Sequence, residues 1–261
     1  MYRLGTTSYI VPADILPNVD YLAGRVSDIQ LVLFETDAHG SNLPDAALRL
    51  ALRERAARHG LTYTVHLPLD LRLADGGAAE HESLVKARRT IEATRELEPA
   101  AYTLHLDAGR LPPPWGLCRD GALPLAVWQE QAVRALEAVS GWVPDPALLC
   151  IENLEKWDPA AYDGVLERVG VSRTADIGHL WLQGLDPVPI LEKWLPRTRV
   201  VHLHGVGARD HQSLLKTPAE RREPVIRWLK ARFDGIVTLE VFNEKDLAES
   251  LEAVRGAGEE K

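Results

Sequence analysis

The chain has 261 residues, a formal net charge of −8 and only two cysteines, Cys118 and Cys150, a size that suits one large domain over residues 1–261. Proteins that bind a nucleic acid backbone usually present a clustered excess of Lys and Arg, so the acidic charge argues against nucleic acid as a partner. No segment reaches the roughly 20 consecutive apolar residues of a membrane helix, so we expect no membrane span. Residues 1–10 lack the pattern of a secretory signal, and the two cysteines are too far apart in the sequence for a redox pair. We therefore expect a cytoplasmic protein.

Short apolar segments rich in β-branched residues alternate with longer amphipathic segments along the chain. This alternation is typical of repeated βα units around a parallel sheet. The predicted strands cover residues 3–8, 29–35, 63–67, 102–106, 148–152, 173–177, 200–204 and 236–241. Eight such units in a chain of this length predict an α/β protein of the (β/α)₈ TIM barrel class.

Three of the intervening helices have clear boundaries. Residues 44–59 end before Gly60, residues 81–97 end before Pro99, and residues 218–233 begin with a proline. Glycine after a helix and proline in its first turn are typical boundary residues. Cys150 is predicted to be a buried strand residue.

The connection formed by residues 107–123 is longer than most βα loops, and it contains three consecutive prolines and Trp115. Long loops at strand ends often form lids or specificity elements. A surface excursion without ligand contact would have the same composition, so both interpretations stay open.

Histidines gather at the predicted strand ends. Six of the nine lie at or just after such an end: His66, His105, His179, His202, His204 and His211. These positions make up roughly an eighth of a barrel chain, so about one histidine would lie there by chance. Because barrel enzymes carry their active sites at the carboxyl ends of the strands, the excess predicts a site there.

Four carboxylates interrupt otherwise apolar strands in the same places: Glu35, Glu152, Asp176 and Glu240. A buried ionised carboxylate is destabilising unless it is paired or bound to a cation. Converging carboxylates also repel one another, so we expect a divalent metal among them. Mixed histidine and carboxylate ligands suit Zn²⁺, Mn²⁺, Fe²⁺ or Co²⁺ better than Ca²⁺, and ligand type alone does not select among these.

Several candidates have a structural interpretation as well. Glu152 and Glu240 would also suit salt bridges to interior Arg or Lys side chains. Asp176 would suit a helix N-cap with His179 nearby by chance. Glu35 fits a substrate-orienting or a purely structural carboxylate equally well.

His202 and His204 alternate along one strand and therefore point to the same side. One of the two should bind metal, and the other should bind substrate or support the ligands. Asp210 and His211 lie in the loop that follows, where exposed polar residues are common.

Other catalytic motifs are absent from the sequence. It contains no GxSxG elbow, no GxxxxGK[ST] loop, no GxGxxG after a strand and no HExxH helix. Nucleophilic catalysis by serine or cysteine is therefore not expected.

The strand-end residues of the second half of the chain resemble the metal tetrad of the xylose isomerase-like barrels: Glu152, Asp176, His202 and Glu240. That superfamily includes sugar isomerases, epimerases and endonuclease IV-type phosphodiesterases. Further histidines resemble ligands of the endonuclease branch, which binds up to three metals: His66, His105, His179 and His211. Arg209 stands where that branch has an aspartate, so a third metal depends on whether Asp210 replaces it.

The opening segment, residues 4–35, resembles the cobamide-remodelling phosphodiesterases of the same superfamily. These enzymes cleave the nucleotide loop of a cobamide, leaving cobinamide phosphate and a riboside, and serve cobamide salvage. The resemblance implies a small-molecule substrate and two or three divalent ions.

The resemblance also implies roles for individual residues. Three would hold one ion: His66, His105 and Glu152. Three others would hold a second, with Glu152 as a bridge: Asp176, His202 and Glu240. His179 and His211 would be further ligands, and Glu152 and Glu240 the catalytic residues. Expected substrate contacts are Glu35, His204 and Trp115, the last on a loop that could cover a flat corrin face.

Two other functions fit the same residues. A sugar or sugar-phosphate isomerase or epimerase would use Glu152 and Glu240 to shuttle protons beside one metal, and it would need fewer strand-end histidines. A non-catalytic barrel would bind metal as a partner protein without hydrolysis. Metal stoichiometry and turnover separate these possibilities.

Overall fold

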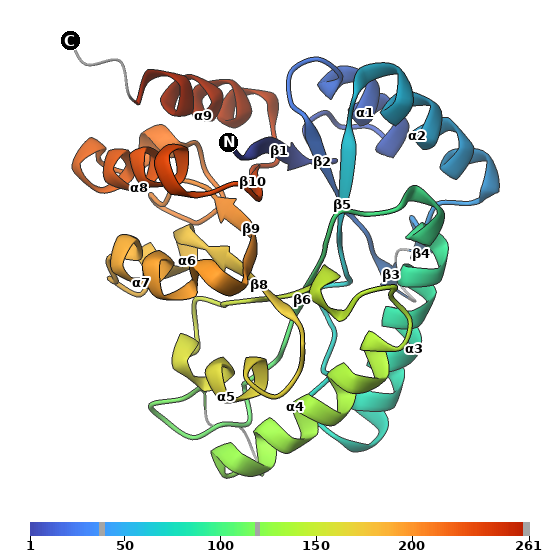
Figure 1. Cartoon of the computed structure of the whole chain (residues 1–261), viewed down its shortest axis with the longest axis vertical. Coiled ribbons are helices and arrows are strands. Elements are labelled where there is room, and N and C mark those ends of the chain that lie inside the picture. The colour runs from blue at the N-terminus through green and yellow to red at the C-terminus, as the bar shows by residue number, and fades with distance from the viewer. Residues whose placement is uncertain (37–39, 118–120, 258–261) are drawn as a thin grey trace.

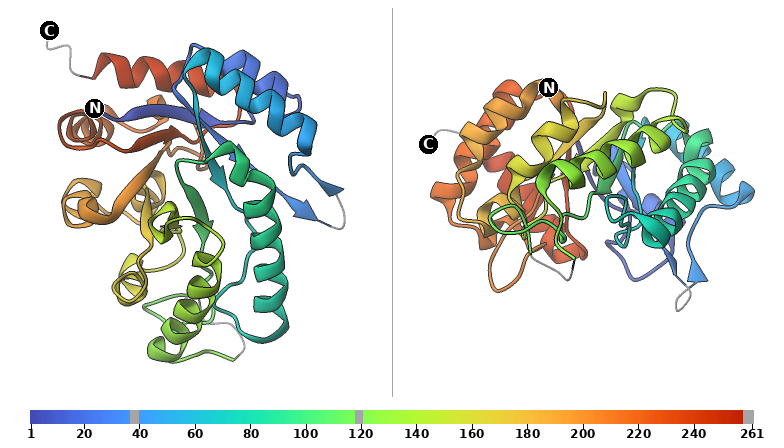
Figure 2. Two further views of the ribbon diagram at one scale, coloured as in Figure 1. Left: turned by 45° about the vertical axis from the view of Figure 1, so that its right-hand side comes forward. Right: turned by 90° about the horizontal axis from the view of Figure 1, so that it is seen from below.

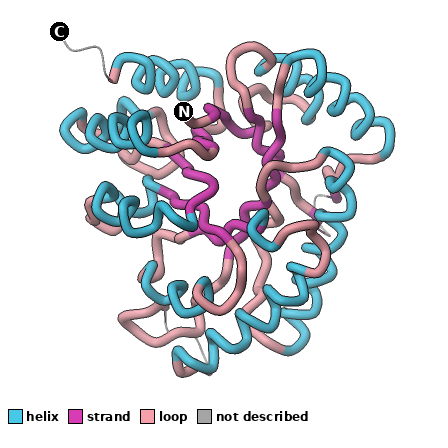
Figure 3. Tube along the Cα trace, viewed as in Figure 1, coloured by secondary structure: helices cyan, strands magenta, loops and turns pink. Residues whose placement is uncertain are grey.

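The computed structural model describes residues 1–36, 40–117 and 121–257. Within them, eight parallel strands close into a barrel in the order β1, β10, β9, β8, β7, β6, β5, β2 (Figure 1). They are β1 (Arg3–Thr7), β2 (Asp28–Val32), β5 (Thr62–His66), β6 (Tyr102–His105), β7 (Leu149–Glu152), β8 (Ser172–Asp176), β9 (Thr198–Leu203) and β10 (Ile236–Leu239). Figure 3 shows these strands as an inner ring surrounded by helices. The predicted (β/α)₈ barrel is confirmed.

The outer layer consists of helices that connect successive strands (Figure 2). They are α1 (Ile15–Leu22), α2 (Ala46–His59), α3 (Gly77–Thr94), α4 (Leu125–Ser140), α5 (Asp163–Leu166), α6 (Ile177–Leu182), α7 (Pro187–Trp194), α8 (Ala219–Arg232) and α9 (Glu244–Gly256). Short 3₁₀ helices cover Arg95–Leu97, Pro146–Leu148, Pro159–Tyr162, Leu195–Arg197 and Leu214–Lys216. The three predicted helix boundaries hold within a few residues. Gly60, for example, ends α2 in the left-handed conformation at φ 67°.

The second predicted strand was wrong at its carboxyl end. Barrel strand β2 stops at Val32, and Glu35 belongs to β3 (Glu35–Thr36), which pairs antiparallel with β4 (Gly40–Ser41) outside the barrel. The reason is Asn42: its side chain accepts from the Phe34 N–H at 2.7 Å and donates to the Val32 carbonyl at 3.0 Å. These bonds satisfy the backbone that would otherwise continue the barrel ladder.

The strand register places the predicted ligands side by side at one end of the barrel. His105 is paired with Glu152 between β6 and β7, and Asp176 is paired with His202 between β8 and β9. Glu240 follows directly after β10. Alternate residues of a strand share a face, so these side chains reach the interior at the carboxyl end, where barrel enzymes carry their active sites.

The long connection after β6 is described for residues 107–117 and 121–123; the predicted lid segment therefore lies partly outside the described residues, as does Cys118. Trp128 of α4 fixes the start of the connection by donating from Nε1 to the Asp107 carbonyl at 2.9 Å. Trp115 is partly buried against the hydrophobic core. Cys150 is fully buried in β7, as predicted. None of the helices in the described part of the chain combines the length and apolarity needed to cross a membrane.

Candidate metal centre

A cleft of about 410 Å³ opens at the carboxyl ends of the strands. Three groups of side chains lie at it, and within each group the donor atoms are within 4.8 Å of one another. The first group is His66, His105 and Glu152; the second is Glu152, Asp176, His202 and Glu240; the third is His179, His204 and His211. The predicted metal ligands are thus brought together in one place.

In the first group, both imidazoles face one oxygen of Glu152. Nε2 of His66 and Nε2 of His105 each lie 3.2 Å from Oε2 of that carboxylate. Nδ1 of His66 lies 2.7 Å from the Leu67 carbonyl oxygen. Because a carbonyl only accepts, Nδ1 carries a proton, and in the tautomer with a single ring proton the lone pair is on Nε2, which faces the carboxylate. A divalent metal ion in place of a proton would hold the imidazole nitrogens and the carboxylate oxygen together.

In the second group, buried carboxylates surround one imidazole nitrogen. Nδ1 of His202 lies 3.2 Å from Oε1 of Glu152, 3.1 Å from Oε2 of Glu240 and 3.8 Å from Oδ2 of Asp176. Burial acts to raise the pKa of Glu152 and of Glu240, but the positive charge of His202 outweighs it and holds both pKa values below their usual range. Burial acts to lower the pKa of His202, and the carboxylates outweigh it and raise that pKa. The group therefore requires positive charge, which a metal ion would supply on displacing the proton.

Asp176 is shared between a helix and this centre. Its Oδ1 accepts from the His179 backbone N–H at 2.6 Å, so Asp176 is the N-cap of α6. Its Oδ2 is buried without a hydrogen-bond partner. Asn153 fixes the Asp176 backbone through two hydrogen bonds of 2.9 Å. The sequence reasoning missed Asn153, because a polar residue after a strand looks like any loop residue.

The third group consists of imidazoles only. The ring centroids lie 4.3 Å apart for His204 and His211, 5.7 Å for His179 and His204, and 5.9 Å for His179 and His211. His204 was expected to contact substrate, but it is fully buried and does not line the cleft. Its Nε2 lies 3.3 Å from Oδ1 of Asp176 instead, among the candidate ligands.

Two buried atoms that could bind a metal, Asp176 Oδ2 and His211 Nδ1, have no hydrogen-bond partner. Two more, Glu240 Oε2 and His204 Nε2, face only another candidate ligand, at 3.1 Å and 3.3 Å. A buried polar atom without a partner costs about 1–3 kcal/mol. Carboxylate oxygens and neutral imidazole nitrogens are the usual ligands of Zn²⁺, Mn²⁺, Fe²⁺ and Co²⁺. A divalent metal ion therefore fits the residues present.

The family model of the xylose isomerase-like TIM barrel matches residues 27–257. The chain belongs to the xylose isomerase-like TIM barrel family. The match includes every barrel strand except β1 and all residues of the three groups. No curated protein sequence matches the chain.

Solved structures share the xylose isomerase-like fold at low sequence identity. A D-tagatose 3-epimerase-like protein is 17% identical, with a TM-score of 0.77 over 98% of this chain and 96% of that chain. Endonuclease IV from Thermus thermophilus is 18% identical, with a TM-score of 0.73 over 99% of this chain and 100% of that one. The 3-keto-D-glucoside 4-epimerase from E. coli is 15% identical, with a TM-score of 0.70 over 98% of each chain. Enzymes with different reactions share the fold, so the fold alone does not select the reaction.

Two predicted substrate contacts of this barrel lie elsewhere. Glu35, carried away from the barrel by β3, accepts from the exposed Arg89 at 2.7 Å. Trp115 packs against the core, and its carbonyl accepts from the Asp158 N–H at 3.2 Å. Neither side chain lines the cleft. The hydrophobic pattern could not show this, because both positions depend on how a connecting segment folds.

The mouth of the cleft carries residues that were not predicted. Leu69 and Phe242 line it and are 61% and 42% exposed. The Phe242 ring meets the His211 ring edge-on at a centroid distance of 5.5 Å. Lys156 is the one Lys or Arg side chain among the lining residues described, and it is 61% exposed. The cleft therefore combines an apolar rim, one ammonium group on a long side chain and a carboxylate-rich interior.

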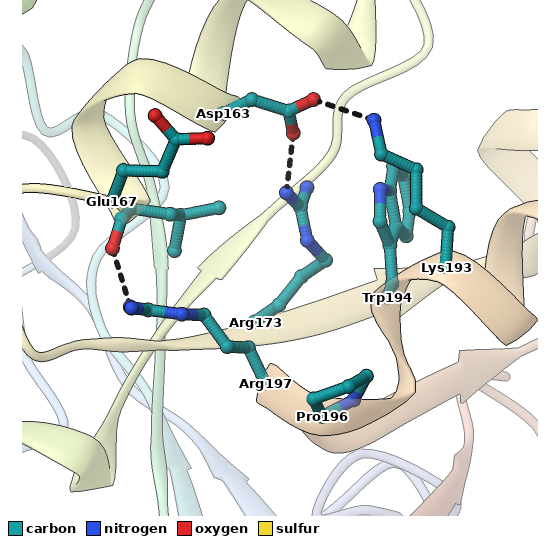
Figure 4. Close-up of a pocket in the computed structure, with 8 residues that line it drawn as sticks. Asp163, Glu167, Arg173, Lys193, Trp194, Pro196 and Arg197 are labelled. Atoms are coloured by element: carbon teal, nitrogen blue, oxygen red, sulfur yellow. Dashed lines mark hydrogen bonds and ion pairs between the residues drawn. The ribbon is translucent and has the colours of Figure 1, made fainter.

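A separate cavity of about 250 Å³ lies at the amino-terminal end of β8, where Arg173 is flanked by α5 and α7 (Figure 4). Asp163 accepts from Arg173 at 3.0 Å and from Lys193 at 2.9 Å. The Arg173 guanidinium carbon also lies 3.9 Å from the centroid of the Trp194 ring. This cavity contains none of the metal-ligating groups, and the ion pairs and the cation–π contact account for the charges of Asp163, Arg173 and Lys193.

Proposed function

We propose that the protein is a metal-dependent phosphodiesterase that cleaves the nucleotide loop of a cobamide to cobinamide phosphate and a riboside. The observation that carries the proposal is the position of Glu152 between two ligand groups. Its Oε2 faces His66 and His105, and its Oε1 faces His202, all at 3.2 Å. A carboxylate with this placement suits a bridge between two ions, the arrangement that suits in-line displacement at phosphorus.

Divalent ions bound here would supply hydroxide near neutral pH and positive charge for the departing oxygen. The side chains of the protein hold the ions and orient the substrate. Glu152 and Glu240 balance the positive charge inside the barrel, and their burial keeps bulk water from the inner side of the centre. Lys156 at the mouth is suited to a non-bridging phosphoryl oxygen, because its ammonium group is a point charge on a flexible stem.

The rim of the cleft supports a bulky substrate with an apolar face. Exposed Leu69 and Phe242 offer apolar contact area at the mouth of the cleft, which a small sugar would not cover. The net charge of −8 disfavours a nucleic acid substrate. The resemblance of residues 4–35 to cobamide-remodelling enzymes supports the cobamide among bulky phosphodiesters. A cytoplasmic location stays a prediction.

A second candidate function is isomerisation or epimerisation of a sugar or sugar phosphate. Oxygens of Glu152 and Glu240 both lie within 3.2 Å of Nδ1 of His202, so two carboxylates flank one position, as proton shuttling beside one metal requires. That reaction gives no role to the first-group imidazoles or to the third group. The additional histidines favour the phosphodiesterase.

One experiment tests the proposal. Purified protein is stripped of metal, reloaded with Mn²⁺, Zn²⁺, Fe²⁺ or Co²⁺, and incubated with cobamides, abasic DNA and ketoses, with products followed by mass spectrometry. We expect metal-dependent release of cobinamide phosphate, abolished in Glu240→Gln and retained in Glu223→Gln, a control on α8 away from the cleft. Epimerisation of a ketose with no turnover of any cobamide would establish the second candidate instead.

A further inference from the structure

We propose that His204 is a metal ligand and completes an all-imidazole site with His179 and His211, in place of the carboxylate expected from the loop after β9. The inference rests on the metal centre of the proposed function and deepens it. It assigns the third ligand to the residue that directly follows strand β9 rather than to Asp210, and it sets the metal preference of that site.

The fold holds the His204 ring in one position. An added Cβ on Gly178 would lie 2.0 Å from Cε1 of His204, so the ring packs directly on the backbone of α6 and only glycine fits beneath it. The ring is fully buried, and its Nε2 makes no hydrogen bond, with Oδ1 of Asp176 at 3.3 Å. Its Nδ1 faces the Gly205 carbonyl oxygen at 3.3 Å and the His211 backbone N–H at 3.0 Å. When the ring proton is on Nδ1 and directed at the Gly205 carbonyl, Nε2 presents a lone pair. A buried histidine confined in this way, with an unpartnered nitrogen beside two other imidazoles, has the geometry of a ligand.

The loop after β9 brings His211 to the same point. Gly205 and Gln212 exchange backbone hydrogen bonds of 2.7 and 3.1 Å, which close the loop at its base. His211 has a φ of 49°, a left-handed conformation that non-glycine residues rarely adopt. Such outliers concentrate at functional sites, where the surrounding structure maintains them. Here the conformation accompanies a ring centroid distance of 4.3 Å to His204, with Nδ1 of His211 buried and unpartnered.

His179 is oriented for the same role. Its Nδ1 lies 2.9 Å from the Asn153 carbonyl oxygen, which accepts the ring proton. Nε2 therefore carries the lone pair. A hydrogen bond of this kind from the far nitrogen to a backbone carbonyl is the usual support of a metal-binding histidine.

Asp210 does not compete with His204 for the ligand position. It is partly exposed and lies 3.7 Å from Nε2 of His211, the nitrogen opposite the unpartnered Nδ1. Arg209 is exposed and does not line the cleft. Asp210 is thus placed to orient the His211 ring from outside, as a positioning residue.

An all-imidazole site has a distinct metal preference. Three neutral imidazoles bring no charge of their own to an ion, and the nearest carboxylate oxygens, on Asp176, Glu240 and Glu155, lie 3.3 to 3.7 Å from the ring nitrogens. Imidazole suits Zn²⁺ and Fe²⁺, whereas Mn²⁺ prefers carboxylate oxygen. We therefore expect Zn²⁺ to occupy all three groups and Mn²⁺ to occupy the two groups that contain carboxylates.

The test is metal stoichiometry, which requires no substrate. Stripped full-length protein is loaded with excess Zn²⁺ or Mn²⁺, desalted and analysed by mass spectrometry of the elements. We expect three Zn²⁺ and two Mn²⁺ per chain, two Zn²⁺ in His204→Asn, three Zn²⁺ in the control Glu223→Gln on α8, and three Zn²⁺ in Asp210→Asn, which tests the alternative ligand. Three Zn²⁺ in His204→Asn, a loss in Asp210→Asn, or two Zn²⁺ in the wild type would each overturn the proposal.

A second measurement covers the case in which His204→Asn fails to fold. Zinc anomalous scattering from wild-type crystals should show an ion in contact with Nε2 of His204, and an ion bound by His211 and Asp210 without His204 would refute the assignment. Failure of the proposed function is a separate result, because a protein that binds three Zn²⁺ but turns over no cobamide retains this site.

Discussion

The amide nitrogen of Gln30 lies 2.8 Å from Nε2 of His202, while the amide oxygen of Gln30 is buried without a hydrogen-bond partner. The two ends of an amide look alike, and a rotation of 180° exchanges them. With the oxygen toward His202, Nε2 donates its proton to Gln30 and Nδ1 presents a lone pair to the second group. Gln30 thereby sets which nitrogen of His202 is free to bind metal.

Gln30→Ala should therefore weaken metal binding without removing a ligand. Loss of a hydrogen bond behind a metal-binding histidine typically lowers affinity about 10–100-fold, and we expect that range in competition titrations against a chelator. Gln131→Ala, a glutamine on α4 away from the cleft, serves as the control. Equal affinities in the two variants would show that the Gln30 contact only fills space.

Glu152→Gln should impair two ion sites at once, because one carboxylate faces both the first and the second group. An ion that binds only the folded state stabilises it by about 2.7 kcal/mol at 100 times its Kd. We expect added Zn²⁺ to raise the Tm of the wild type and of Glu223→Gln, and to raise that of Glu152→Gln far less. A full zinc-dependent shift in Glu152→Gln would refute the shared role.

Asp28 should make stability depend on pH. The carboxyl is fully buried in β2, and burial raises its pKa to about 6, against the hydrogen bonds from Thr62 and Thr64. Because the folded pKa lies above the unfolded one, this group's stabilising effect is present below the unfolded pKa and is lost as the pH rises through about 6. As the pH rises from about 4 to about 8, the free energy of unfolding of the wild type should fall by about 2 kcal/mol relative to that of Asp28→Asn, as measured by urea unfolding. Parallel pH profiles for the two proteins would contradict this.

Arg173 and Lys193, the two partners of Asp163 in the cavity of Figure 4, should contribute unequally to the stability of the fold. Arg173 is only 3% exposed, so Asp163→Asn leaves a buried cation without its carboxylate and should destabilise the fold by about 3 kcal/mol. Lys193 is 70% exposed, and Lys193→Met should change stability by less than about 1 kcal/mol. Urea unfolding measures both, and metal content should be unchanged in each. A larger effect from Lys193 would be inconsistent with the burial of Arg173.

The barrel and most of the candidate ligands could be predicted because they depend on local periodicity. An apolar strand interrupted by a charged residue at its carboxyl end is visible in sequence, and His66, Glu152 and Glu240 were found in that way. Glu35 shows the same pattern but leaves the barrel, because the side chain of Asn42 takes over the backbone hydrogen bonds after Val32. Such a side-chain contact does not change the hydrophobic periodicity of the sequence, so the sequence pattern cannot reveal it.

The role of His204 was unpredictable for a different reason. Strand alternation placed it on the same side as His202, and it left open which of the two would bind metal. The distinction depends on the missing side chain of Gly178 and on the left-handed conformation of His211, which together define the space around the ring. Neither is apparent until the segments are packed against each other.

Asp176 caps α6 and also faces the candidate metal centre, so metal binding should affect the backbone of that helix. One oxygen caps α6 and the other faces the centre, so an ion that immobilises the carboxylate also secures the first turn of that helix. The amide protons of α6 (Ile177–Leu182) should then exchange with solvent deuterium more slowly in the loaded protein. A six-residue helix on the outside of the barrel would in this way report on whether the interior has taken up its ion.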